Sequence, residues 1–260
     1  MTGSFSSRCA TSLRVIHALI LREISARYAE SRAGYLWAIL TPIISILTLY
    51  FVFALIRQRE TEIPLLAFLV TGWFTFGFYQ SMVSMIANSE AANKALLMHQ
   101  NVTRLDVIAS RGLLEVLTTA LFLCVGGVLA MMVEEASLPD DPLLTALSFF
   151  SAGFVGLSVG VLVCAIMTYF PVAMNFINPI NRLGFFISGV LFTTSALPSW
   201  TYDYVKWNPI LHSIEGMRQG WFETYQSPVL DIAYPYTVGL PILMIGLFLE
   251  RRTRRGIRIG

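Results

Sequence analysis

The feature that most constrains this chain is a series of apolar segments long enough to cross a lipid bilayer. A helix needs about 20 apolar residues to cross a hydrocarbon core of roughly 30 Å. Charged residues make up 13% of the sequence and hydrophobic ones 55%, whereas about 25% of a soluble domain is charged. We therefore predict an all-α membrane protein with six transmembrane helices, the last of them shorter, at residues 36–56, 65–87, 107–133, 143–170, 172–194 and 234–249.

The distribution of lysine and arginine outside these spans predicts the orientation. Short cytoplasmic loops retain positive charge during insertion. Twelve of these cations lie in the N-terminal segment, the loop after the second span and the tail RRTRRGIRIG, and only four lie on the opposite side. The loop EEASLPDD carries four acids and no base. We expect both termini in the cytoplasm, which requires an even number of spans.

Two enzyme or cofactor interpretations find little support in the residues. The segment GLSVG fits the pattern around a serine nucleophile, but no predicted span contains the histidine that an intramembrane serine protease would need. Gly153, Gly156 and Gly160 instead form a smooth stripe for close helix packing. The three histidines fall in separate segments, so no metal site is expected, and no cofactor is expected in this chain.

Few residues of this chain could couple it to a source of energy. A nucleotide-hydrolysing chain needs a glycine-rich loop followed by lysine, and neither Lys94 nor Lys206 lies in one. An ion-driven carrier, which stays open as an alternative, would need ionisable residues at mid-membrane. Glu115 could pair with Arg111 near a span end. Arg182 lies in a polar, proline-containing helix entry, where it could meet cytoplasmic water or an anionic substrate.

Two charged segments flank the first two spans, one before the first span and one after the second. SLRVIHALILREISARYAESRAGYLW has apolar and charged residues on different sides, which predicts a helix lying along the inner membrane surface. NKALLMHQNVTRLDVIASRG, residues 93–112, is unusually charged for this chain. A positive loop that only sets topology explains the second segment as well as a partner-binding site does.

Several motifs in order resemble a known family. RE at 22–23, RY at 27–28, LW at 36–37, LLMHQNVTRLDVIASRGLLE, FFISGVLFTTSALPSW and WNPILHSIEGMRQGWF together resemble the membrane subunits of type 2 ABC exporters, in particular those that export capsular polysaccharide. The likeness extends from about residue 11 to 252. It implies a cytoplasmic tail and interface helix over 1–35, a six-span domain over 36–250 and a basic tail over 251–260.

The resemblance implies a role for the charged segments at the cytoplasmic side. In this family the segment after the second span forms a coupling helix, here at about 88–100, that docks on an ATPase subunit. The implied contacts with that ATPase come from the coupling helix and from the N-terminal helix, namely Arg22, Glu23, Arg27, Glu90, Asn93, Lys94 and Leu97.

The resemblance also implies re-entrant gate helices at the periplasmic mouth, at about 195–233. Aromatic rings there could stack on sugars, or they could form the aromatic belt that many membrane proteins show. Candidate gate residues are Trp200, Trp207, His212, Glu215, Arg218 and Trp221. A polymer path through the membrane would need lining, for which we select Trp73, Phe76, Tyr79 and Arg182.

We therefore expect a permease subunit of an ATP-driven exporter, not an enzyme, that moves lipid-linked capsular polysaccharide across the bacterial inner membrane. The implied partners are a second copy of this chain, two copies of an ABC ATPase that binds ATP and Mg, a periplasmic polysaccharide co-polymerase and an outer-membrane exporter, with no nucleic acid. Export of O-antigen or teichoic acid by a sister permease, and ion-driven transport, are the alternatives.

Overall fold

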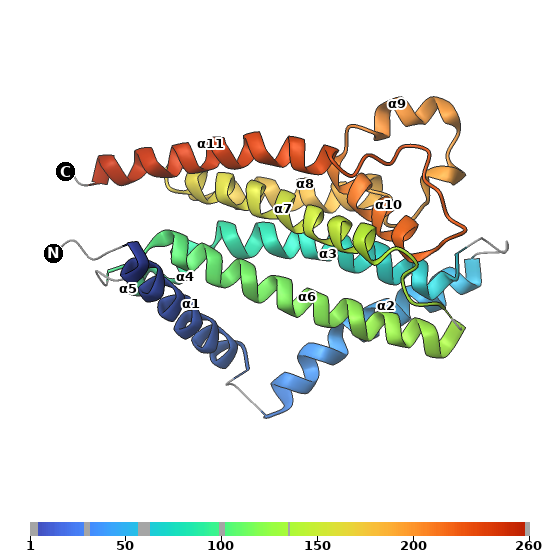
Figure 1. Cartoon of the computed structure of the whole chain (residues 1–260), viewed down its shortest axis with the longest axis horizontal. Coiled ribbons are helices and arrows are strands. Elements are labelled where there is room, and N and C mark those ends of the chain that lie inside the picture. The colour runs from blue at the N-terminus through green and yellow to red at the C-terminus, as the bar shows by residue number, and fades with distance from the viewer. Residues whose placement is uncertain (1–4, 29–31, 57–62, 99–101, 135, 258–260) are drawn as a thin grey trace.

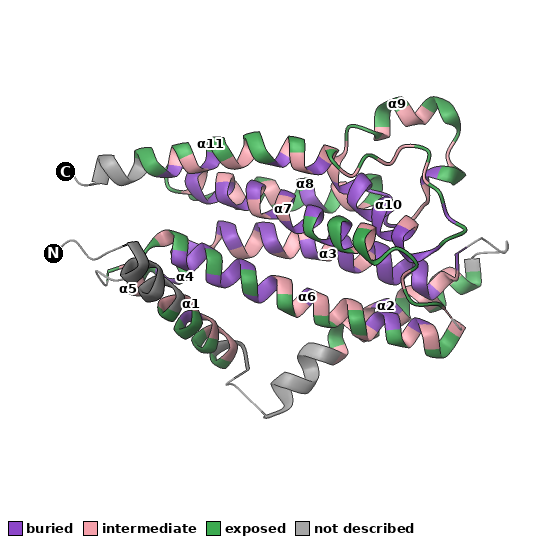
Figure 2. Ribbon diagram, in the orientation of Figure 1, coloured by how far each residue is buried: buried purple, intermediate pink, exposed green. Residues whose placement is uncertain are grey.

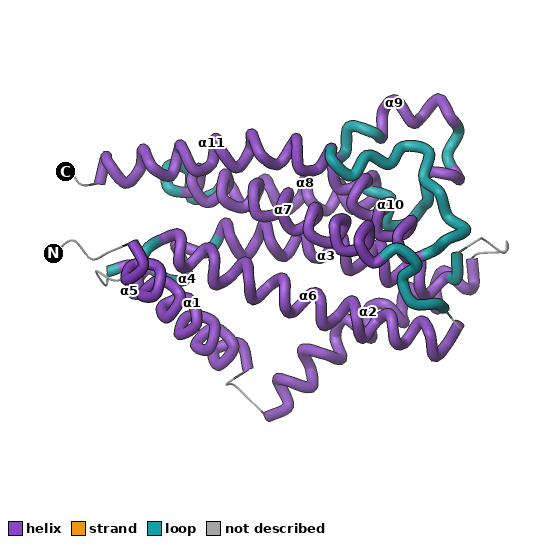
Figure 3. The backbone as a smooth tube through the Cα atoms, viewed as in Figure 1, coloured by secondary structure: helices purple, strands orange, loops and turns teal. Residues whose placement is uncertain are grey.

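The computed structural model describes residues 5–28, 32–56, 63–98, 102–134 and 136–257, with side chains in α1, α2 and α11 described for 14–25, 40–55 and 234–252. The described residues form helices connected by short loops (Figure 1). The tube in Figure 3 shows only helix and loop over these ranges. The long helices are α1 (Phe5–Tyr28), α2 (Arg32–Ile56), α3 (Leu65–Ala87), α6 (Arg104–Glu134), α7 (Pro142–Met167), α8 (Ala173–Ile187), α10 (Pro209–Trp221) and α11 (Tyr234–Ile257).

The long helices confirm the predicted all-α membrane architecture in its coarse form. Within the described residues, α3, α6 and α7 are long and apolar enough to cross a membrane, and α2 contains a shorter apolar helix over Leu40–Leu55. The predicted second span has the bounds of α3. The predicted sixth span lies inside α11, which continues past residue 249 into charged residues.

The predicted fifth span is shorter than expected. Instead of residues 172–194, the structure has α8 over Ala173–Ile187, about 22 Å of helix at 1.5 Å per residue. The helix stops because Gly189 adopts φ +80°, a left-handed backbone that ends a helix and that glycine adopts without a Cβ penalty. A Cβ at Gly189 would also lie 2.7 Å from the Leu211 side chain.

α7 is the central helix of the bundle and packs against α3, α10 and α11. Its small residues allow a very close approach to α3. A Cβ at Gly156 would lie 2.8 Å from both Met82 Cβ and the Tyr79 carbonyl oxygen, and one at Gly160 would lie 2.7 Å from Ile86 Cβ. The structure thus confirms that the glycine stripe in GLSVG serves helix packing, as small residues do in membrane interfaces.

Side-chain caps define where the long helices begin. Asp141 accepts a hydrogen bond from the Leu144 amide and is followed by Pro142 at the first turn of α7. Thr103 and Asp106 bond reciprocally at the start of α6, in the manner of a capping box. The Glu134 carboxylate, at the C-terminal end of α6, accepts a hydrogen bond from the Leu66 amide at 2.7 Å and so caps the start of α3. These caps satisfy backbone donors that the first turn of a helix leaves without an intrahelical partner.

The two ends of the bundle differ in charge and in structure. At one end, which we call the basic end, lie α4 (Ser89–Ala92), α5 (Lys94–Leu97), the start of α6 and the last turns of α11 (Figure 1). The opposite end, here the gate end, holds η1 (Thr194–Ala196), η2 (Ser199–Thr201), α9 (Tyr202–Val205) and α10. In Figure 2 the buried residues concentrate along α3, α7 and α10, whereas much of α8 and α11 is exposed.

We predict that Gly156→Ala lowers the stability of the folded protein by about 1–3 kcal/mol, the cost of overpacking a close contact. Gly112→Ala on α6 is the matched control, because its Cβ would meet Met82 and Ile86 at ordinary distances of 3.8 and 3.9 Å. Thermal unfolding of both variants in the same detergent measures the difference. Equal midpoints for Gly156→Ala and Gly112→Ala would contradict the close-packing account.

Candidate coupling and gate sites

The segment after α3 forms two short helices where the sequence suggested one coupling helix over about 88–100. α4 and α5 are separated at Asn93, whose backbone leaves the helical region. The Asn93 side chain is buried, and its Nδ2 donates to the Ser89 carbonyl at 3.0 Å. The break arises because this asparagine bonds to nearby backbone and side chains, which lets the chain turn between α4 and α5. Residues 99–101 lie outside the described part.

Of the four coupling residues predicted on this segment, two bind other residues of this chain and two are available. Asn93 is buried, and Glu90 pairs with Arg104 at 2.9 Å. Lys94 is exposed and Leu97 is half-buried. Lys94 and Leu97 are therefore the members of the predicted set that can meet another protein without breaking an ion pair in this chain.

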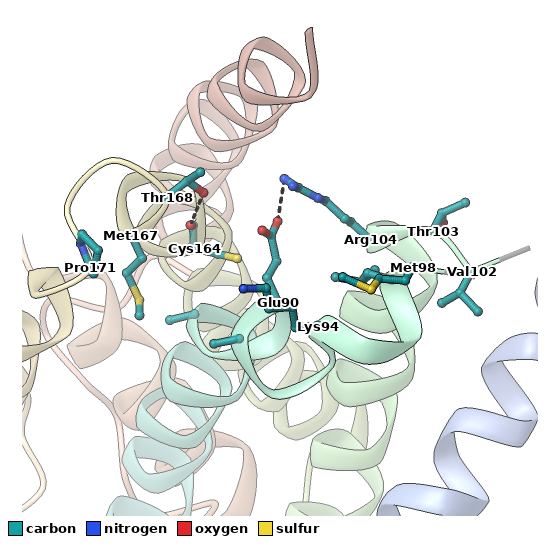
Figure 4. Close-up of a pocket in the computed structure, with 13 residues that line it drawn as sticks. Glu90, Lys94, Met98, Val102, Thr103, Arg104, Cys164, Met167, Thr168 and Pro171 are labelled. Atoms are coloured by element: carbon teal, nitrogen blue, oxygen red, sulfur yellow. Dashed lines mark hydrogen bonds and ion pairs between the residues drawn. The ribbon is translucent and has the colours of Figure 1, made fainter. Parts of the chain in front are cut away.

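Arg104 holds the basic end together. Its guanidinium lies 2.9 Å from the Glu90 carboxylate and 3.7 Å from that of Glu250 on α11, so it joins α4, α6 and α11. Beside this ion pair is a hollow of about 760 Å³ between α4, α5 and the end of α7 (Figure 4). Glu90, Lys94 and Arg104 supply its charged groups, whereas Met98, Met167 and Pro171 are among its apolar lining.

α1 is attached to this end by polar side chains. Glu23 forms an ion pair with Arg111 of α6 at 3.2 Å, and Arg111 also donates to the Met85 carbonyl of α3 at 3.2 Å. Arg22 donates to the Asn93 side-chain oxygen. Arg22 and Glu23, which the sequence suggested as contacts to an ATPase, thus bind residues of this chain. The side chain of Arg27 lies outside the described residues.

The residues proposed to line a substrate path divide into two groups. Trp73 and Phe76 of α3 make edge contacts with Phe185 of α8, with ring centroids 5.6 and 5.4 Å apart. The Tyr79 hydroxyl donates to the Asn181 side chain of α8 at 3.1 Å. In this chain the three aromatic residues therefore hold α8 against α3.

Arg182 differs from those aromatic residues. It is exposed on α8, whose neighbouring Asn181 is buried against Tyr79. Its position leaves the guanidinium available to solvent or to another molecule.

At the gate end, Glu215 and Arg218 of α10 form a fully buried ion pair at 3.1 Å. Arg218 also donates to the carbonyl oxygens of Phe192 at 2.8 Å and Val190 at 3.2 Å. Its guanidinium carbon lies 4.0 Å from the centre of the Phe68 ring on α3. Glu215 and Arg218 are three residues apart on α10, but their pair does more than stabilise that helix. It also binds α10 to α3 and to the segment after α8.

Glu215 has further partners that the sequence did not suggest. Both Thr194 and Tyr225 donate their hydroxyls to its second carboxylate oxygen. Burial, with the neighbouring Glu215 charge, raises the pKa of the Tyr225 phenol to about 12. The phenol consequently stays protonated at physiological pH and remains a donor. This network satisfies a carboxylate that burial alone would penalise.

His212 connects the gate helices to the segment that enters α11. Its Nδ1 accepts the Asp231 amide at 3.0 Å, so Nε2 carries the proton and donates to the Lys206 carbonyl at 2.8 Å. Both ring nitrogens are thus occupied. The sequence suggested His212 as a gate residue, and the structure gives it a positioning role between Lys206 and Asp231.

The three tryptophans proposed for the gate fall into two classes. Trp200 and Trp207 are exposed, at 70% and 68% of their full surface. Trp221 is 6% exposed, and its indole nitrogen donates to the Ser137 carbonyl at 3.1 Å. Trp221 therefore belongs to the core, where it packs closely against Gly127 of α6, and it does not present a face to a ligand in this structure.

Sequence reasoning missed Tyr225, Thr194 and Phe68 at the gate and Arg104 at the basic end. Gly72 on α3 leaves room for Arg218, which the sequence had already suggested, since a Cβ there would lie 2.9 Å from its Nη2. Nothing in local spacing, however, places Thr194 or Tyr225 beside Glu215, because those contacts come from tertiary folding.

Together these elements define a multi-pass helical membrane protein with a charged basic end and an opposite end of short helices. The comparisons identify its family: residues 14–222 match the ABC-2 type transporter model, and the chain belongs to that family. It is 27% identical over 255 residues to the capsule polysaccharide export inner-membrane protein BexB of Haemophilus influenzae, covering 98% of this chain and 96% of the relative.

Two further relatives extend the comparison. The polysialic acid transport protein KpsM of Escherichia coli is 28% identical over 237 residues, covering 91% of this chain and 92% of the relative. The O-antigen export system permease protein RfbA of Klebsiella pneumoniae is 24% identical over 238 residues, with 87% and 86% covered. The chain is thus similar over most of its length to permeases that carry bacterial glycans.

The attachment of α1 can be tested by charge reversal. Glu23→Arg and Arg111→Glu each leave two like charges facing across a largely buried contact, and we expect each to lower stability by about 2–3 kcal/mol, somewhat less than the 3–5 kcal/mol for a fully buried pair. The double variant restores an ion pair and should recover part of this loss. Additive losses in thermal unfolding would show that the two residues do not interact.

Alanine substitutions at a buried and at an exposed tryptophan should have different effects on stability. We expect Trp221→Ala to lose about 3–5 kcal/mol of stability, since it empties a buried aromatic site. Trp207→Ala should keep the thermal midpoint of the unmodified protein, because its ring is largely exposed. Matched unfolding curves provide the measurement, and a destabilised Trp207→Ala protein would place Trp207 in the core instead.

Proposed function

We propose that this chain is the permease subunit of an ATP-driven exporter that moves lipid-linked capsular polysaccharide outward across the inner membrane of a Gram-negative bacterium. The observation that carries the proposal is the similarity to capsule polysaccharide export proteins over 98% of the chain. Residues 14–222 also match the ABC-2 type transporter family. O-antigen export is the second candidate, favoured by the similarity to RfbA.

The proposed topology has six crossings with the basic end in the cytoplasm. Lys94, Arg104, Arg251 and Arg252 gather at that end, as the retention of positive charge in cytoplasmic loops predicts. The fifth crossing would be α8 together with the residues after Gly189. α9 and α10 would form a periplasmic gate, since α10 is only about 20 Å long and cannot cross a membrane alone.

Energy would come from a partner ATPase that binds ATP and Mg. The sequence contains two lysines, neither in a phosphate-binding loop. Support for docking at α4 and α5 comes from the exposed Lys94 and Met98 and the half-buried Leu97, which offer a cation beside apolar side chains. This pattern fits a groove on the partner ATPase that combines acidic and apolar groups.

The assembly would contain two copies of this chain and two ATPase subunits, with a periplasmic co-polymerase and an outer-membrane exporter completing the route. A second copy is supported by the exposed apolar surface of α8, where Phe176, Leu183 and Phe186 are each more than 60% exposed. Large apolar faces of this kind are covered by lipid or by protein in a membrane.

Deleting the gene in its native host tests the proposal. We expect polysaccharide to disappear from the cell surface and to accumulate inside the cell, and the unmodified gene should restore export. Continued surface display at the parental level would overturn the assignment. Loss of surface O-antigen with an intact capsule would favour the second candidate.

Lys94 provides a sharper test of the docking role. Reversing Lys94 and Glu90 together would also break the Glu90–Arg104 pair. We therefore expect Lys94→Glu to reduce export strongly while membrane insertion and thermal stability stay at the level of the conservative control Lys94→Arg. Parental export by Lys94→Glu would remove Lys94 from the docking surface.

A further inference from the structure

A second hollow lies along the apolar parts of α3, α6, α7 and α11. It has a volume of about 630 Å³ and runs between α6 and α11, with α3 and α7 forming its floor. Phe78, Met82 and Gly153 lie along the floor, and Leu113 and Leu243 belong to the two walls. We call it the α6–α11 groove.

The groove has almost no polar lining. Its one hydroxyl belongs to Tyr236, which donates to the Leu147 carbonyl at 2.8 Å, so the groove meets only the ring. A water molecule needs two or more polar partners to be stable in such a site, and the groove does not offer them. An empty groove would also leave its lining without dispersion contacts. An apolar occupant is therefore required.

The dimensions select the kind of occupant. The lining comes from residues 105–116 of α6, 150–161 of α7 and 236–247 of α11, each stretch about 16 Å long. That length matches one leaflet, about half of a hydrocarbon core of roughly 30 Å.

The charges at one end of the groove favour an anionic headgroup. Arg104 and Glu250 form an ion pair between α6 and α11 at 3.7 Å, and Glu90 shares the same arginine. Arg251 and Arg252 follow on α11 and are exposed. Together these five residues carry one net positive charge at the level where lipid headgroups meet the basic end.

We propose that the α6–α11 groove binds one phospholipid of the leaflet at the basic end. An acyl chain lies between α6 and α11, and an anionic headgroup lies at Arg251 and Arg252. The bound lipid completes the packing of α6 against α11, which the ion pair of Arg104 and Glu250 joins at the basic end. The inference does not depend on which glycan is exported.

The test uses the purified full chain in nanodiscs of equal phosphatidylethanolamine and phosphatidylglycerol, with a trace of phosphatidylglycerol carrying a photoreactive diazirine in its acyl chain. We expect photolabelling of peptides from α6 and α11 that exceeds labelling of the exposed face of α2. Ala109→Trp fills the groove from α6 and should abolish this labelling, whereas Ala54→Trp on the exposed face of α2 should not. Arg251→Ser with Arg252→Ser should reduce the preference for phosphatidylglycerol over a photoreactive phosphatidylethanolamine.

A variant that cannot misfold through its new bulk keeps the test decisive. Ala109→Cys, modified with a hexyl thiosulfonate after purification, should lose the photolabel that the unreacted variant retains. Uniform labelling of all outer faces, or labelling unchanged by either modification of residue 109, would overturn the proposal. A disulfide between the Ala109→Cys residues of two copies would also overturn it, because a second chain would then occupy the groove.

Discussion

The close approach of α7 to α3 is the contact on which the rest of the structure depends. It is possible because Gly156 and Gly160 have no side chain where Met82 and Ile86 pack. α3 continues from this contact toward α4 at the basic end and toward Phe68 and Gly72 at the gate end. The pair of helices thus connects the two candidate sites through well-packed elements.

Buried charge follows a consistent rule in this apolar chain. Arg111, Glu215 and Arg218 are at least 93% buried, and each has a charged partner or backbone carbonyls within hydrogen-bond distance. Such groups are costly at membrane depth unless they are paired. Their pairs join elements that are distant in the sequence: α1 with α6, and α10 with α3 and the segment after α8. Polar contacts therefore specify how the apolar helices are arranged.

Apolar length and glycine spacing were sufficient to predict much of the fold, including the bounds of α3 and the packing role of the stripe in α7. The predicted fifth span was too long because the left-handed turn at Gly189 follows an apolar run that shows no break in hydropathy. For the candidate sites, the sequence suggested residues but could not predict which of them are exposed. Trp207 and Trp221 have the same residue type, yet tertiary packing exposes one and buries the other. Tertiary packing likewise buries Asn93 and pairs Glu90 with Arg104.

The central claim is that this chain works as the membrane half of an ATP-driven exporter, with α4 and α5 as its docking surface. The most direct measurement is purification from the native membrane in mild detergent, followed by protein identification and determination of the mass of the complex. The account predicts an equimolar companion with a phosphate-binding loop, two copies of each subunit, and loss of the companion in Lys94→Glu. A chain that purifies without any ATPase under several conditions would contradict it and leave the basic end as a topological signal.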